Sequence, residues 1–126
     1  MPETHLTVDQ QRRIAEIQEY LKITERVKRL VTELEANRAA QPNVLKGICE
    51  TIARDLSQMR QRALTSNIGT IADVAGAMSV MAARGGGVNM KVRGLADGVN
   101  SLTMQLEHAL KVASTPEPKR GGNRPA

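Results

Sequence analysis

The chain has 126 residues, 40% of them hydrophobic and 25% charged, a size and balance that indicate one compact soluble domain and exclude two full domains. Phe and Trp are absent and Tyr20 is the single aromatic residue, so the core must consist of aliphatic side chains and methionine, which favours helices over strands. The net charge is +5, but the excess is spread along the chain, so it indicates solubility before it indicates an anionic partner.

The first predicted helix begins after Thr7 and extends to about Asn37. The Thr7 hydroxyl can accept a hydrogen bond from the backbone of Gln10, whose side chain can reach back to Thr7, as in a capping box. Apolar residues then recur mostly at steps of three and four, the period of an amphipathic helix. They are Ile14, Ile17, Leu21, Ile23, Val27, Leu30, Val31 and Leu34.

The second predicted helix opens at Pro42, because proline lacks an N–H group that the first helical turn does not use. It carries the most regular apolar stripe of the first half of the chain. The stripe is Leu45, Ile48, Ile52, Leu56, Met59 and Ala63. Polar residues 65–67 break this pattern, and Ser66 or Asn67 is expected to cap the next helix.

The third predicted helix covers Ile68 to Arg84 and carries charge only at Asp73 and Arg84. So few charges predict that it is the most enclosed helix of the set. Three glycines, 85–87, follow it and are expected to stop it, since glycine readily adopts the left-handed conformation of a helix end.

The fourth predicted helix begins near Val88 and continues through Leu110. Residues 88–93 alternate apolar and polar, as in a strand, and Gly94 and Gly98 each cost a helix about 1 kcal/mol relative to Ala. We prefer the helix, because its apolar repeat continues unbroken and no second strand is present to pair with it. The repeat is Val92, Leu95, Val99, Leu102, Leu106 and Leu110.

Small residues predict close packing of the third and fourth helices. The spacing of Gly94 and Gly98 allows two helix backbones to approach closely. An alternative is a groove with adaptable walls, because methionine side chains conform to varied apolar partners. The methionines concerned are Met78, Met81, Met90 and Met104.

Four amphipathic segments with short connections predict an all-α, antiparallel up-down four-helix bundle. We expect the bundle to cover residues 7–114, with a flexible N-terminus over 1–6 and a disordered basic tail over 115–126. At 1.5 Å per residue, the predicted helices are about 45, 33, 25 and 39 Å long. The first and last helices should therefore project past the other two at one end and leave apolar side chains poorly covered there.

Catalytic and metal chemistry lack the residues that they need. Cys49 lies on or near an apolar stripe, and the histidines, His5 and His108, are far from it in sequence. Inward-facing carboxylate pairs are also missing, because Glu50, Asp55 and Glu107 fall outside the stripes, while Asp73 is expected on an exposed strip or beside an arginine. We therefore expect no enzymatic activity, no cofactor and no metal site.

The sequence thus predicts a non-enzymatic interaction or assembly module that forms a homodimer or binds a helical protein partner. The predicted interface lies on the first and last helices. It consists of Ile14, Ile17, Leu106, Leu110 and Val112. The alternative is a basic accessory protein that contacts nucleic-acid phosphates. That function would use Arg60, Arg62, Lys119, Arg120 and Arg124.

We expect a cytoplasmic location without membrane contact. A single cysteine cannot form an intramolecular disulfide, and residues 1–5 show neither the basic nor the apolar region of a secretory signal. The most apolar stretch, 68–83, is shorter than the roughly 20 residues that span a bilayer and contains Asp73.

Overall fold

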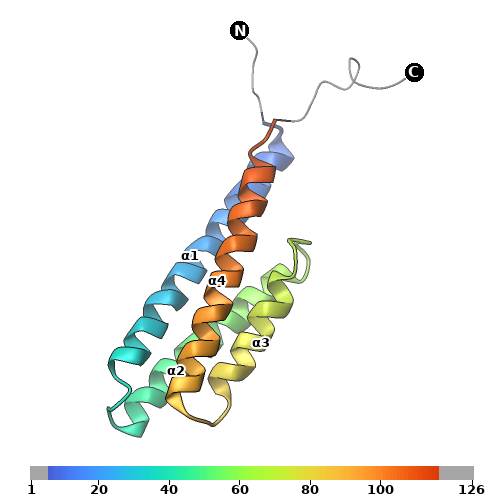
Figure 1. The fold of residues 1–126 in the computed structure, drawn as a ribbon. Coiled ribbons are helices and arrows are strands. Elements are labelled where there is room, and N and C mark those ends of the chain that lie inside the picture. Colours follow the sequence, from blue (N-terminus) through green and yellow to red (C-terminus); the bar gives the residue numbers. More distant parts are fainter. Residues whose placement is uncertain (1–5, 117–126) are drawn as a thin grey trace, which may run out of the picture.

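A computed structural model describes residues 6–116, which form four α-helices and no strand. The helices are α1 (Val8–Ala36), α2 (Pro42–Ala63), α3 (Ile71–Ala83) and α4 (Val88–Ala113). Helix α1 packs on α2 and α4, and α3 packs on the same two helices, so each helix has two neighbours in a four-membered ring (Figure 1). The predicted all-α up-down four-helix bundle is confirmed. Residues 117–126, which contain most of the predicted tail, lie outside the described part of the chain.

Local sequence signals set the starts of α1 and α2 as predicted. The backbone N–H of Gln10 donates to Thr7 Oγ1 at 3.0 Å, and the Thr7 N–H donates to Gln10 Oε1 at 2.9 Å, which completes the capping box. Pro42 occupies the first turn of α2. Both signals need only neighbouring residues, and for that reason the sequence locates them correctly.

Helix α3 begins later than the sequence predicts, at Ile71 instead of Ile68. Asn67 and Gly69 have φ angles of 53° and 49°, which a right-handed helix cannot include. The cap is Thr70, so the prediction of Ser66 or Asn67 is wrong; the Thr70 N–H donates to Gln105 Oε1 of α4 at 2.8 Å. The start of α3 is therefore held by a side chain 35 residues away in the sequence, and not by a local side-chain cap.

Residues 88–100 are helical throughout, so the strand alternative for the start of α4 is wrong. Gly94 and Gly98 form notches in α4 that receive Met81 and Met78 of α3. A Cβ atom placed on Gly98 would lie 2.5 Å from Met78 Sδ, and one on Gly94 would overlap Met81 Sδ. Close packing of α3 and α4 is confirmed. The four methionines do not line one groove, since Met78 is buried and Met90 is 80% exposed.

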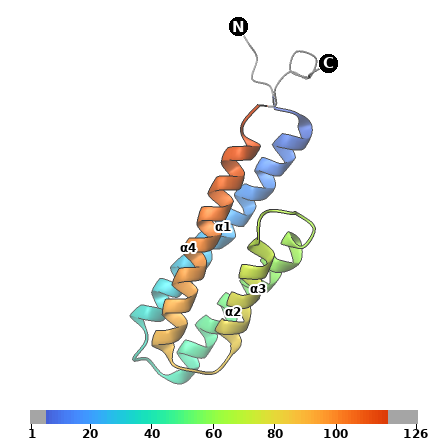
Figure 2. The same cartoon turned by 45° about the vertical axis from the view of Figure 1, so that its right-hand side comes forward.

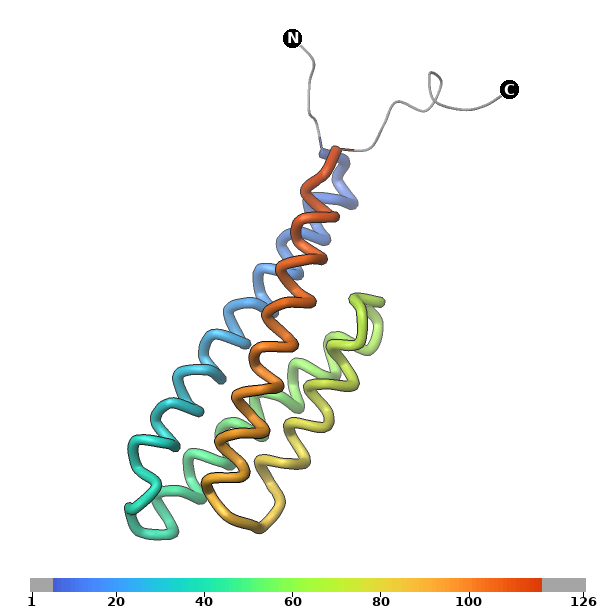
Figure 3. The backbone as a smooth tube through the Cα atoms, viewed as in Figure 1, coloured from blue at the N-terminus to red at the C-terminus, as the bar shows by residue number. Residues whose placement is uncertain are grey.

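Helices α1 and α4 are longer than their partners, with 29 and 26 residues against 22 in α2 and 13 in α3. Both views of the ribbon and the backbone tube show the consequence: the start of α1 and the end of α4 extend together beyond the loop between α2 and α3 (Figures 1, 2 and 3). We call residues 8–14 and 109–113 the projection. At 1.5 Å per residue its α1 part is roughly 10 Å long.

Candidate functional site

The predicted interface residues divide into enclosed and accessible groups. Ile17 and Leu106 are fully buried inside the single chain, so their assignment to an intermolecular surface is corrected. Ile14 and Leu110 are half-buried at the edge of the core. Val112 is 59% exposed. Only the outer part of the predicted surface is therefore accessible to a partner.

The loop between α2 and α3 contacts α1 at Arg13, one turn before Ile17, and α4 at Gln105, next to Leu106. The Arg13 guanidinium of α1 donates to the backbone carbonyls of Ser66 and Asn67 at 2.9 and 3.2 Å. Ile68 of the same loop belongs to the buried core. The sequence predicts that α1 and α4 lose their cover where the shorter helices end. The connecting loop extends this cover beyond the helix ends, which the sequence prediction missed.

A buried polar cluster fixes that loop against α1. The Ser66 hydroxyl donates to Glu16 Oε2 at 2.6 Å and lies 2.7 Å from the Tyr20 hydroxyl, which also donates to Glu16 at 3.1 Å. The Arg62 guanidinium lies over the Tyr20 ring, 5.6 Å from its centre. Burial raises the pKa of Tyr20 above its ordinary value of 10.0, and the carboxylate of Glu16 adds to this effect. Tyr20 is therefore a neutral hydrogen-bonding group near pH 7, and the cluster positions the loop.

The projection and the loop enclose a hollow of about 560 Å³. Gln10 and Arg13 of α1, Ile68 of the loop, and His108 and Val112 of α4 are among its lining residues. The Gln10 side chain donates to the carbonyl of Thr115 at 2.9 Å and links the two chain ends of the projection. The hollow occupies the space that longer α2 and α3 helices would fill.

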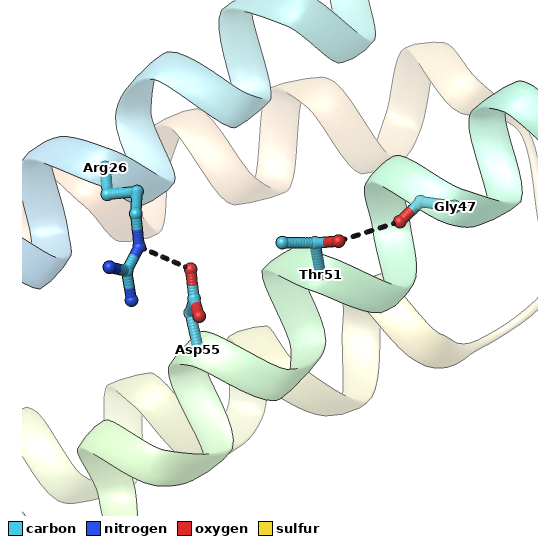
Figure 4. A network of polar contacts seen from close by, with 4 residues as sticks. All are labelled: Arg26, Gly47, Thr51 and Asp55. Atoms are coloured by element: carbon cyan, nitrogen blue, oxygen red, sulfur yellow. Dashed lines mark hydrogen bonds and ion pairs between the residues drawn. The ribbon is translucent and has the colours of Figure 1, made fainter.

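Asp55 is the one buried carboxylate of the described residues, although the sequence pattern placed it outside the apolar stripe. Arg26 Nε of α1 donates to Asp55 Oδ2 at 2.8 Å, so the carboxylate joins α1 to α2 (Figure 4). A turn earlier in α2, the Thr51 hydroxyl donates to the Gly47 carbonyl (Figure 4). Asp73 is exposed, which confirms one of the two expectations for it. Among residues 6–116, neither Arg26 nor Asp55 forms a second ion pair, so their contact is structural.

The arginines of the predicted nucleic-acid surface are not brought together. Arg60 and Arg62 are both exposed, but Arg62 lies over Tyr20 of α1, whereas Arg60 lies against Gly76 of α3. The remaining members of that predicted surface lie outside the described residues. They are Lys119, Arg120 and Arg124.

Within residues 6–116, no cluster of three or more His, Cys, Asp or Glu side chains is placed to hold a metal ion. None of the helices described here combines the length and apolarity needed to cross a bilayer. Comparison of the chain with protein-family models, with curated proteins and with solved structures finds no match.

Proposed function

We propose that the protein is a non-enzymatic helical assembly module that forms a homodimer through the projection. The observation that carries this proposal is the mismatch in helix length, which leaves a pair of helices without the second pair that completes a four-helix cross-section. The projection of a second copy supplies such a pair when the two copies are related by a two-fold axis.

Apolar surface on the projection supports this arrangement. Val8 and Val112 are 68% and 59% exposed, and Ile14 and Leu110 are half-buried beside them. Contact with a second copy would remove these side chains from water, at roughly 25 cal/mol for each Å² of apolar surface buried.

The charges of the projection also suit a second copy of itself. Asp9 and Glu107 carry negative charge, and Arg12 and Lys111 carry positive charge, at or beside this end of the bundle. A surface of mixed sign can pair with its own copy, whereas a surface of one sign would repel it.

Sedimentation equilibrium over a range of protein concentrations tests the proposal. We expect the wild-type chain to approach twice its monomer mass, and V112E to remain a monomer, because a carboxylate cannot be buried without a partner. The control is M90E, a substitution at an exposed residue at the opposite end of the bundle, which should dimerise like the wild type. A monomeric wild-type chain at high concentration, or equal dimerisation of the two variants, would refute the proposal.

The second candidate function is phosphate contact with nucleic acid. Arg60 and Arg62 favour it, because both residues are exposed and neither forms an ion pair within residues 6–116. The two functions differ in salt dependence: phosphate binding weakens steeply as salt rises, while apolar association persists. A gel shift at low salt that disappears in R60Q/R62Q would support nucleic-acid binding, and the absence of any shift would exclude it.

A further inference from the structure

A second hollow lies at the opposite end of the bundle from the projection, between the start of α2 and the end of α3. Its volume is about 560 Å³, within the range of sites that bind small molecules. The walls are mainly apolar. Among the residues that line it are Leu45, Cys49, Ala53, Ala82 and Val88. We call this hollow the basal groove.

The charged residues that line the basal groove are mostly positive. Lys46, Arg84 and Lys91 line it together with a single carboxylate, that of Glu50. Within residues 6–116, none of these three cations forms an ion pair. The groove therefore combines apolar walls with an excess of uncompensated positive charge.

Lys91 is the least solvated of the three cations. Its side chain is half-buried, and its ammonium group has two weak contacts, 3.4 Å from the Ala82 carbonyl and 4.0 Å from Cys49 Sγ. A cation that is partly removed from water gains free energy from an anion placed beside it. Such an anion would sit above the buried Cys49 thiol.

The helix starts at this end add partial positive charge. Helices α2 and α4 both begin beside the basal groove, at Pro42 and Val88, and neither Gln41 nor Gly87 supplies a side-chain cap. Their first-turn N–H groups are free of side-chain acceptors, and helix N-termini favour negative charge.

From these observations we propose that the basal groove binds a small carboxylic acid with an unbranched apolar chain. The chain lies against Leu45, Ala53 and Val88, and the carboxylate lies beside Lys91. The size of the groove fits a small molecule, and Lys91 is the only half-buried cation of the three, so one anionic group beside it and an apolar chain along the walls suit this lining. The site is independent of the projection, so it can be tested whether or not the protein dimerises.

Isothermal titration with decanoate, below the concentration at which it forms micelles, measures the binding. Two control probes separate the contributions of charge and chain: decanol has the chain without the carboxylate, and acetate has the carboxylate without the chain. We expect decanoate to bind and both controls to bind at least about tenfold more weakly, as loss of a charge-assisted contact or of the apolar burial implies.

Variants locate the site. K91M keeps the length of the side chain and removes its charge, and we expect it to weaken decanoate binding about tenfold. K22M, at an exposed position on α1, is the matched control and should bind like the wild type. A53L should block the groove by filling it, and circular dichroism confirms that each variant is folded.

Cys49 provides a second readout, because it is the only cysteine of the chain and lies in the groove wall. Bound decanoate should slow the alkylation of Cys49 by iodoacetamide, whereas decanol and acetate should not. The proposal is overturned if decanoate does not bind, if decanol binds equally well, or if K22M and K91M weaken binding to the same extent.

Discussion

Replacement of Gly98 by alanine tests the close packing of α3 against α4. An alanine Cβ at this position would lie 2.5 Å from Sδ, 2.6 Å from Cγ and 2.9 Å from Cε of Met78. Cγ is near the root of the side chain, so rotation of the terminal methyl group cannot relieve the overlap. Met78 is 2% exposed, so its side chain is enclosed and does not border solvent.

The change in the free energy of unfolding that G98A causes is the sum of two opposing effects. Alanine is favoured over glycine in a helix interior by about 1 kcal/mol, while overpacking a tight core costs about 1 to 3 kcal/mol. We expect G98A to lower the free energy of unfolding by about 1 kcal/mol. Gly47, in α2, has nothing within 4 Å of the same added atom, so G47A should raise the free energy of unfolding by about 1 kcal/mol.

Gly94 is an intermediate case. The atoms of Met81 that an added Cβ would displace are the far end of the side chain, Sδ and Cε, while Cγ is at an ordinary distance of 4.0 Å. Met81 is half-buried and can turn toward solvent. We therefore expect G94A to change stability little. From the most to the least stable, the order of the variants is G47A, G94A and G98A.

Urea denaturation followed by far-ultraviolet circular dichroism measures these differences, since unfolding of a helical domain abolishes the helical signal. A second test places G98A in an M78A background. There the added methyl group no longer meets Met78, and G98A should become stabilising. If G98A stabilises the otherwise wild-type chain as much as G47A does, the packing argument is refuted.

Three further predictions concern the polar contacts. The pKa of Tyr20 is raised by burial, so the stability that its neutral form contributes is complete below pH 10.0 and is lost as pH rises through the folded pKa. The tyrosinate absorbance of this single tyrosine should titrate above pH 10.0, and a midpoint at or below 10.0 would contradict the burial. R26A should lower the free energy of unfolding by about 1 to 3 kcal/mol, because it removes the partner of buried Asp55. Urea denaturation of R26A in the wild-type and D55A backgrounds separates the contribution of the ion pair from other effects of the substitution, and an equal effect in both backgrounds would exclude the contact. T7A removes the cap of α1 and should cost about 1 kcal/mol, measured by the same denaturation; no change would mean that the cap contributes nothing.

The sequence by itself determined the number of helices, the starts of α1 and α2, and the projection at one end. Each of these depends on residues close in the chain: the Thr7 and Gln10 box, the proline at position 42, and the three- and four-residue spacing of apolar side chains. The length of a helix is its number of residues multiplied by the rise per residue, so the extent of each apolar repeat also determines the mismatch between the helices.

The tertiary structure alone decided which apolar residues of the projection are accessible, and thus most of the candidate site. Ile17 and Leu106 are covered at the level of a loop held by Arg13, and the start of α3 depends on Gln105 of α4. Periodicity records the face of a helix on which a residue lies, but not whether a distant loop folds over that face. Contacts between residues 35 to 54 positions apart decide that, and no local pattern in the chain encodes them.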